Sequence, residues 1–321
     1  MTNRLVLGLV AAGLALTVGC KSPSRAAQTP KNVLVVSVTA GFRHGGAIDT
    51  SDRILPKLAQ ESGAFTLDWV REPAGKPNPP QKPKALKADA DDAAKVKYQA
   101  EVTKWEASTA AFKAADAEYQ AKFKLEMAKL SPKNLKNYDA VIFDNTTGDL
   151  PLPDRQAFLD WVKSGKGFVG IHAATDTYHD FPGYIEMIGA EFKTHGAQVS
   201  VECINQDPKH PACKMLPQSY VVYDEIYQVK NFDRKQVHGL LTLDKHPNDK
   251  TQGDYPIAWC KAYGQGRVFY TALGHREDVW DPAWKDRKNS PEVATLYQQH
   301  LLAGIKWALG LVPGDATPQV K

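Results

Sequence analysis

Several features that would define a class of protein are scarce or absent in this sequence. Positive charge exceeds negative charge by only four, with 40 Lys and Arg against 36 Asp and Glu, so composition gives no electrostatic reason to expect a nucleic acid partner. Only four cysteines occur in 321 residues, and a chain of this length can fold without a disulfide framework. The 23 Gly and 21 Pro are ordinary numbers, which excludes a collagen-like or wholly disordered chain. These absences leave a globular protein of one large, decorated domain or of two domains.

The apolar run near the N-terminus is too short to span a membrane. It covers residues 5–18 after a single charge at Arg4, whereas a transmembrane helix needs about 20 apolar residues. A positive start, a short apolar stretch and a small-residue end are typical of a signal peptide, which we predict at residues 1–19. Residues 20–31 then form a flexible tether rich in Ser, Ala and Pro. We therefore expect an exported protein.

The four cysteines add to the prediction of export. The segment Leu16-Thr17-Val18-Gly19-Cys20 resembles a bacterial lipobox. The resemblance implies that the thiol of Cys20 carries a diacylglycerol, which anchors the protein to a membrane, in the periplasm or at the cell surface, without crossing it. Thr17 stands where the motif usually has Leu, so ordinary secretion is the alternative. In an oxidising compartment Cys203 and Cys213 either close a loop disulfide or stay free, and Cys260 fits a packed position in a strand.

Short apolar segments alternate with helical patterns after the tether. The nearly continuous apolar run at 32–39 predicts a strand buried on both faces. Three further short strands are predicted at 65–70, 140–144 and 167–171. Helical patterns cover 47–61 and 153–164. This alternation indicates an α/β domain at residues 32–311 with a parallel sheet covered on both sides. Near its end we predict a β-hairpin of strands 256–260 and 267–272, a helix at 290–309 and a frayed tail at 312–321.

One segment does not fit an average α/β domain. Four prolines lie between residues 77 and 83, and residues 84–131 contain no Gly or Pro and are rich in Ala, Lys and Glu. Apolar residues recur along this segment: they are Tyr98, Val102, Trp105, Phe112, Tyr119, Phe123 and Leu130. They predict a helical insertion at about 76–131, as one long helix or as a hairpin that turns near Ser108. It is either a docking arm or wall over the site, or a solvated insertion whose apolar stripe packs on its own domain.

Candidate functional residues follow the predicted strands, because doubly wound sheets bind ligands at the carboxyl ends of their strands. After the first strand, glycines flank the cation of Arg43 and the titratable imidazole of His44. Asn145 follows the third strand. His172 follows the fourth, at the centre of a turn that resembles a nucleophile elbow. We expect this turn to raise the His172 imidazole into an open crevice.

The residue types limit the chemistry. Because the turn has neither Ser nor Cys, familiar acyl-enzyme chemistry lacks a nucleophile. His172 is therefore a general base, a general acid or a metal ligand, or else a buried structural histidine. Several imidazoles and the adjacent carboxylates Asp224 and Glu225 are of the type that binds zinc. We take His195 and His210 as candidate metal ligands, although no pair has a local spacing such as H-E-x-x-H.

Five motifs in order resemble those of the ThuA-like (trehalose-utilisation) family. They are Gly41-Phe42-Arg43-His44, Gly170-Ile171-His172-Ala173-Ala174-Thr175-Asp176, His210-Pro211, Asp224-Glu225-Ile226-Tyr227 and Gly266-Arg267-Val268-Phe269-Tyr270-Thr271-Ala272-Leu273-Gly274-His275. The resemblance covers about residues 32–309 outside the insertion. It implies a flavodoxin-like, doubly wound parallel sheet of the class I glutamine amidotransferase type. In that superfamily the elbow presents Cys, so His172 excludes amidotransferase activity. The resemblance also implies sugar catabolism through 3-keto intermediates, beside a sugar dehydrogenase partner.

We therefore expect a lyase, isomerase or hydrolase that acts on a disaccharide or 3-keto-glycoside by acid–base chemistry, with or without a zinc-type divalent metal. The expected catalytic residues are His172, His44, Arg43, Glu225 and His275. The expected substrate-binding residues are Asp176, Thr175, Asn145 and Tyr227. The alternative is a non-catalytic surface lipoprotein that binds a carbohydrate or a partner, with Trp69, Trp259, Trp280 and Trp284 as stacking faces.

Overall fold

The computed structural model describes residues 1–2 and 29–319. The apolar run, Cys20 and most of the predicted tether lie outside the described residues. Among the residues that are described, no helix has the length and apolar character needed to cross a membrane.

Nine strands of the described chain form one mixed sheet. Its first part is parallel, in the order β2-β1-β3-β4-β11. These strands are β1 (Lys31–Val36), β2 (Phe65–Val70), β3 (Ala140–Asp144), β4 (Gly167–Ile171) and β11 (Gly266–Thr271). In β1, Val33 and Val35 face one apolar core, and Leu34 and Val36 face the other. A strand with apolar residues at every position is therefore buried on both sides, as predicted.

The sheet continues in an antiparallel part, β11-β10-β9-β6-β7. Its further strands are β10 (Gln252–Tyr263), β9 (His238–Lys245), β6 (Val199–Asn205) and β7 (Ser219–Asp224). The pairing of Tyr263 with Gly266 confirms the predicted hairpin between β10 and β11. A separate two-stranded antiparallel sheet consists of β5 (Glu191–His195) and β8 (Tyr227–Lys230).

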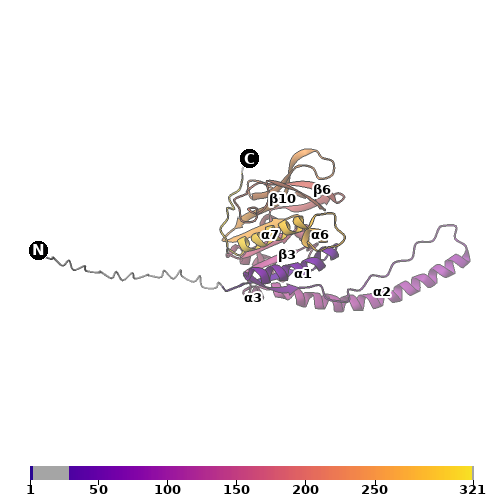
Figure 1. Cartoon of the computed structure of the whole chain (residues 1–321). Coiled ribbons are helices and arrows are strands. Elements are labelled where there is room, and N and C mark those ends of the chain that lie inside the picture. The colour runs from indigo at the N-terminus through magenta and orange to yellow at the C-terminus, as the bar shows by residue number, and fades with distance from the viewer. Residues whose placement is uncertain (3–28, 320–321) are drawn as a thin grey trace.

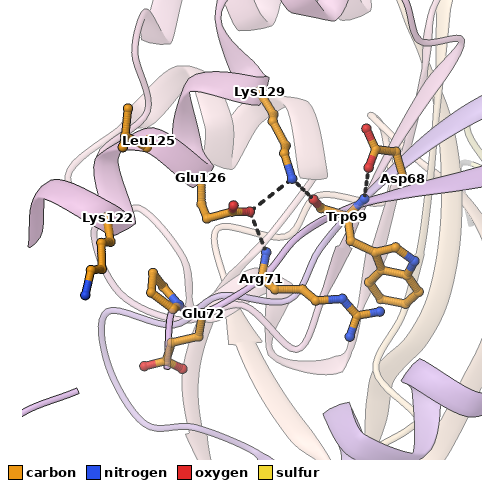
Figure 2. Close-up of a pocket in the computed structure, with 9 residues that line it drawn as sticks. Asp68, Trp69, Arg71, Glu72, Lys122, Leu125, Glu126 and Lys129 are labelled. Carbon is orange, nitrogen blue, oxygen red and sulfur yellow. Dashed lines mark hydrogen bonds and ion pairs between the residues drawn. The ribbon is translucent and has the colours of Figure 1, made fainter. Parts of the chain in front are cut away.

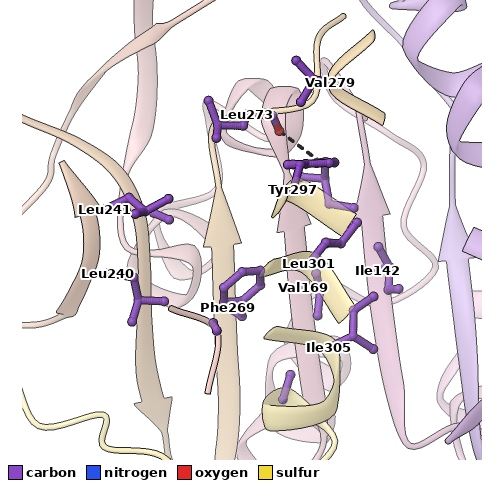
Figure 3. Close-up of a cluster of buried hydrophobic side chains, with 14 of the residues drawn as sticks. Ile142, Val169, Leu240, Leu241, Phe269, Leu273, Val279, Tyr297, Leu301 and Ile305 are labelled. Atoms are coloured by element: carbon purple, nitrogen blue, oxygen red, sulfur yellow. Dashed lines mark hydrogen bonds between the residues drawn. The ribbon is translucent and has the colours of Figure 1, made fainter. Parts of the chain in front are cut away.

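Helices cover both faces of the sheet. The first core contains residues of α1 (Gly45–Ser62) and α7 (Pro291–Ala308), and Figure 3 shows Leu301 and Ile305 of α7 beside Val169 and Phe269 of the strands. The second core contains residues of α4 (Arg155–Lys163) and α5 (Pro182–Ile188). The shorter helical elements are η1 (Ala128–Leu130), α3 (Pro132–Leu135), η2 (His172–Asp176) and α6 (Glu277–Trp280). The result is a layered α/β body.

The insertion is a single helix, α2 (Asp92–Met127), and not a hairpin that turns near Ser108. It extends beyond the α/β body together with the segment that precedes it (Figure 1). Only its last turns, at Tyr119, Phe123 and Met127, are buried in the second core. Farther out, Trp105 donates a hydrogen bond to the Pro80 carbonyl. The outer part of the apolar stripe therefore contacts the Pro-rich segment and not the sheet.

The structure also describes most of the predicted tail and the three cysteines outside the N-terminal segment. In the described part of the predicted tail, through residue 319, Trp307 donates to the Gly314 carbonyl and the Thr317 carbonyl accepts from His238. Cys203 and Cys213 are buried free thiols, as is Cys260, so the structure contains no disulfide between them.

Candidate active site

His172 lies at the turn after β4. Its backbone is left-handed, with φ of +46°, a conformation that destabilises any residue other than Gly and is often found at functional sites. The turn requires small neighbours, because a Cβ added to Gly170 would lie 3.2 Å from that of Ala174. The ring of Tyr227 packs on the imidazole, with centroids 4.2 Å apart. His172 is fully buried, so the prediction of an open crevice around this ring is wrong.

Hydrogen bonds orient the His172 ring. Nδ1 lies 2.7 Å from the Ala272 carbonyl oxygen, and because a carbonyl only accepts, Nδ1 carries the proton of the neutral ring. The lone pair of Nε2 then faces the other site residues. Nε2 lies 3.3 Å from Nδ1 of His275 and 3.6 Å from Oε2 of Glu225. Histidines that bind metals are commonly oriented by a backbone carbonyl in this way.

Asp224 positions both Glu225 and His275. Asp224 ends β7 and is fully buried. Its carboxylate accepts hydrogen bonds from the backbone N–H groups of Gly274, at 2.8 Å, and of Arg276, at 3.1 Å. The loop after β11 is thereby fixed with Nδ1 of His275 3.3 Å from Oε2 of Glu225. Of the two adjacent carboxylates, Glu225 therefore faces the site and Asp224 supports it, a division of roles that the sequence did not reveal.

His44 enters the site from the loop between β1 and α1. Thr147 ties this loop to the segment after β3, because its hydroxyl donates to the Phe42 carbonyl and its carbonyl accepts from the Ala40 N–H, each at 2.8 Å. Nε2 of His44 lies 3.3 Å from the Tyr227 hydroxyl and 4.0 Å from Oε2 of Glu225. The polar segments after the first and third strands thus lie together, and the first supplies the site residue.

The two-stranded sheet adds His195 and Tyr227, which pair with each other across β5 and β8. Nδ1 of His195 lies 3.1 Å from Oε1 of Glu225. The His195 side chain is 45% exposed, whereas that of Glu225 is 10% exposed. Among the imidazoles that contact Glu225, His195 is therefore the one with the widest access to solvent.

Four residues form what we call the histidine–glutamate centre: His44, His172, Glu225 and His275. Each offers one ligand atom, and these atoms lie within 4.8 Å of one another. Zinc binds imidazole nitrogen and carboxylate oxygen at about 2.0–2.2 Å, so tetrahedral ligands lie about 3.3–3.6 Å apart. The three separations among His172, Glu225 and His275 are 3.3, 3.3 and 3.6 Å. These three ligand atoms therefore fit a zinc-type ion, whereas Nε2 of His44, 4.0 Å from Oε2 of Glu225, lies slightly outside this range.

The electrostatics of His44 and Glu225 suit ligation, whereas His275 must release a proton when it binds a metal ion. Burial, and then the neighbouring His172 and His275, lower the pKa of His44 to about 3. Burial tends to raise the pKa of Glu225, but the neighbouring imidazoles of His172 and His275 outweigh it and hold that pKa well below its ordinary value. Burial likewise tends to lower the pKa of His275, but the hydrogen bond and charge of Glu225 leave it raised. A neutral imidazole and an ionised carboxylate are the forms that bind metal ions.

A pocket of about 240 Å³ opens beside the centre. His44 and His275 form part of its wall, with Phe42, Arg43, the start of α1, Gln198, Arg276 and Glu277. Phe42 is 70% exposed, and its ring meets that of His44 edge-on, with centroids 4.9 Å apart. The pocket is smaller than the 300–1,000 Å³ typical of drug-sized ligands. It combines one apolar face with charged and amide groups.

Other predicted site residues do not line this pocket. His210 is buried against Trp307 and lies 3.7 Å from the Cys260 sulfur, so the structure does not bring the candidate metal ligands His195 and His210 together. Thr175 bonds the Tyr270 hydroxyl, Asn145 bonds Asp144, and Asp176 pairs with His179. His300, on α7, is also fully buried and does not line the pocket.

The tryptophans offer few stacking faces. Trp259 and Trp280 are fully buried in the cores. The guanidinium of Arg71 lies over the ring of Trp69, 4.1 Å from its centroid, and that of Arg53 lies 6.0 Å from the Trp284 centroid. The aromatic residue at the pocket is instead Phe42.

Fold and site together define an α/β protein with a cluster of imidazoles and a carboxylate beside the ends of its parallel strands. The sequence matches the model of the ThuA family, described as trehalose utilisation, over residues 94–308. Because this match covers more than half of the chain, the protein belongs to the ThuA family. The matched region includes His172, Glu225 and His275, and begins after His44.

Comparison with solved structures supports the same fold. A protein described as ThuA-like from Bacteroides uniformis has a TM-score of 0.57 at 20% identity, over 89% of this chain and 95% of that one. A second, from Parabacteroides merdae, has a TM-score of 0.56 at 19% identity, over 91% and 93% of the two chains. No curated protein matches the sequence.

Proposed function

We propose that this protein is an enzyme that processes a saccharide, namely a disaccharide or a 3-keto-glycoside, at the histidine–glutamate centre. The main support is the placement of three imidazoles and a carboxylate within 4.8 Å of one another, beside a pocket that two of them line. Membership of a family described as trehalose utilisation favours a sugar as the ligand. A pocket of about 240 Å³ suits one sugar ring.

The proposed step is proton removal from a carbon next to a ketone. The C–H electron pair forms the new C=C bond, the C=O π pair moves to the oxygen to give an enolate, and an imidazole accepts the proton. General bases of this kind typically contribute about 10²–10⁴-fold. His195, which contacts both Glu225 and solvent, can exchange that proton with water. His44, His172, Glu225 and His275 would hold a zinc-type ion, which would supply Lewis acidity toward the carbonyl oxygen. Arg43 adds positive charge at the pocket wall.

The test combines metal content with turnover. The mature protein is incubated with glycosides and their 3-keto forms, with and without divalent metals, and products are identified by mass spectrometry. We expect turnover of a keto-sugar, and loss of both activity and bound zinc in His172→Ala and His275→Ala. His246→Ala is the matched control, because His246 contacts Asp249 and Tyr255 outside the site.

The outcomes separate the alternatives. Unchanged turnover in His172→Ala contradicts the catalytic assignment. Saccharide binding in calorimetry without product favours the non-catalytic binding protein. Turnover that survives chelation, in protein without bound metal, restricts the centre to acid–base chemistry.

We further propose that the protein is exported and that Cys20 is lipidated. The short apolar run and the lipobox-like segment support this. Cys20→Ser is expected to remove a diacylglycerol-sized mass and membrane association, and an unchanged distribution between membrane and soluble fractions contradicts it.

The parallel order β2-β1-β3-β4-β11 supports the proposal that this half is wound like flavodoxin.

A further inference from the structure

The geometry points to a role for the helical insertion: it positions Arg43 at the pocket, through Tyr119 and Glu72. Arg43 lines the pocket beside His44. Tyr119 belongs to α2, and Glu72 lies where the chain leaves β2 toward the insertion. This inference deepens the proposed function, and it rests on that function where saccharide kinetics are the readout.

Three residues form a continuous chain of hydrogen bonds. The Tyr119 hydroxyl donates to Oε1 of Glu72 at 2.9 Å, and Nη1 of Arg43 donates to Oε2 of the same carboxylate at 2.8 Å. Nη1 also donates to the Ser37 carbonyl at 3.1 Å. The Glu72 side chain is only 11% exposed, so its bonds to Tyr119 and Arg43 are shielded from water and stronger than surface pairs.

Tyr119 is suited to fix the carboxylate. Its side chain is buried, and its ring stacks on that of Phe123, with centroids 6.2 Å apart. Burial, and then the bond to Glu72, raise the pKa of Tyr119, so its hydroxyl remains a donor. The other partner of Oε1 is Lys76, whose side chain is 52% exposed. The buried phenol, rather than the solvated lysine, therefore holds the orientation of Glu72.

The inner end of the insertion is itself anchored to β2. Lys129 donates to the Trp69 carbonyl at 2.6 Å and to Glu126 at 3.1 Å, and Glu126 accepts from the Arg71 N–H at 3.3 Å. Figure 2 shows these contacts around a pocket of about 480 Å³ between the end of α2 and β2. The base of the insertion thus has a fixed position from which Tyr119 reaches Glu72.

Arg43 connects these hydrogen bonds to the pocket. Its side chain is 37% exposed, and only Nη1 is used by Glu72 and Ser37. The rest of the guanidinium remains available to a ligand in the pocket. Loss of the Tyr119 hydroxyl is therefore expected to loosen Arg43 and weaken saccharide binding, while the histidine–glutamate centre keeps its metal.

The test compares Tyr119→Phe and Glu72→Gln with the wild type. We expect the KM of the saccharide to rise about 3- to 10-fold, as for the loss of one ordinary hydrogen bond, with kcat and bound metal nearly unchanged. Tyr98→Phe is the matched control: Tyr98 lies on the same helix, and its hydroxyl has no hydrogen bond to any described residue. In an Arg43→Ala background, Tyr119→Phe should change KM no further, because the effect passes through Arg43.

A second measurement does not depend on activity. Phenylglyoxal modifies accessible guanidinium groups, and mass spectrometry of the digested protein gives the rate at each arginine. Arg43 should react several-fold faster in Tyr119→Phe and Glu72→Gln than in wild type or Tyr98→Phe. Arg267, which bonds the carbonyls of Trp307 and Val312, serves as the internal reference.

An unchanged Arg43 rate overturns the inference, whatever the enzyme does. The inference is also overturned if Tyr119→Phe raises KM equally in the wild-type and the Arg43→Ala backgrounds. If wild type neither binds nor converts any saccharide while the Arg43 rate rises as expected, the proposed function fails and the positioning of Arg43 stands.

Discussion

His172 combines two unfavourable features in one residue. Its backbone is left-handed and its imidazole is fully buried. Left-handed backbone costs an L-residue roughly 1–2 kcal/mol, a cost that Gly avoids. The turn is closely packed: a Cβ added to Gly170 would lie 3.0 Å from the Tyr270 ring and 3.2 Å from the Cβ of Ala174. The left-handed backbone is therefore imposed by the turn, and it should persist when the imidazole is removed.

This separation predicts a difference between two variants that both lack the ring. His172→Gly should be more stable than His172→Ala by about 1 kcal/mol, because only Gly adopts positive φ without strain. Urea denaturation of the metal-free proteins measures the difference. Equal stability of the two would mean that the turn relaxes when the ring is removed.

Phe42 is the second residue with a prediction of its own. Its exposed ring forms the apolar face of the pocket, and an aromatic face packs against the C–H groups of a sugar ring. Phe42→Ala should raise KM about 10-fold without lowering stability, whereas Phe42→Trp should retain affinity. Steady-state kinetics and thermal unfolding test both points. A KM for Phe42→Ala equal to that of wild type contradicts the assignment.

At the scale of elements, α2 divides into an anchored and a projecting part. Tyr119, Phe123 and Met127 are buried, whereas Tyr98, Trp105 and Phe112 are only half-buried. Sequence periodicity predicted the helix and its stripe, but not which part of the stripe meets the body. That depends on the Pro-rich segment, whose path beside Trp105 is not encoded in any repeating pattern.

The division predicts unequal effects of the same substitution along one stripe. Phe123→Ala should destabilise the protein by about 3–5 kcal/mol, because it leaves a cavity in the second core. Phe112→Ala, farther out, should cost less than about 1 kcal/mol. Denaturant unfolding of both variants provides the comparison. Similar losses would show that the outer helix is part of the cooperative core.

For the whole molecule, buried imidazoles make the fold sensitive to acid. Burial is the first cause that lowers the pKa of His44 to about 3, and those of His210 and His300 to about 4. In the unfolded chain these groups titrate near 6.5. Below that pH the unfolded state binds protons that the folded state does not, so stability falls as pH decreases. Groups with raised pKa values, such as His275, contribute stability that is complete below pH 6.5 and do not oppose this loss.

His300 provides the test, because it lies outside the histidine–glutamate centre. Its Nδ1 donates to the Ala212 carbonyl, and its buried Nε2 has no hydrogen bond to any described residue. Between about pH 6.5 and pH 4, His300→Gln should reduce the slope of unfolding free energy against pH by up to about 1.4 kcal/mol per unit. Urea titrations of metal-free protein measure the slope. The same slope in both proteins would contradict a buried, neutral His300.

Much of this architecture could be predicted from the sequence, because buried parallel strands are continuous apolar runs and their carboxyl ends meet at one edge. That rule singled out His44, His172 and His275. His210 was chosen only as an imidazole of the type that binds zinc and not by this rule; it follows β6, in the antiparallel part of the sheet, and packs against Trp307. The supporting role of Asp224 was not predictable, because its partners Gly274 and Arg276 are brought to it only by the fold.

The insertion leaves the body at Glu72 and returns to the same carboxylate at Tyr119. Because both ends of the insertion are attached to the α/β body at Glu72, a break at the outer end of the insertion leaves both parts of the polypeptide bound to the body. Proteolytic nicking near residues 85–91, or grafting of a fluorescent domain there, should therefore be tolerated. The outer part of α2 offers a place to attach a reporter to a protein whose pocket lies elsewhere.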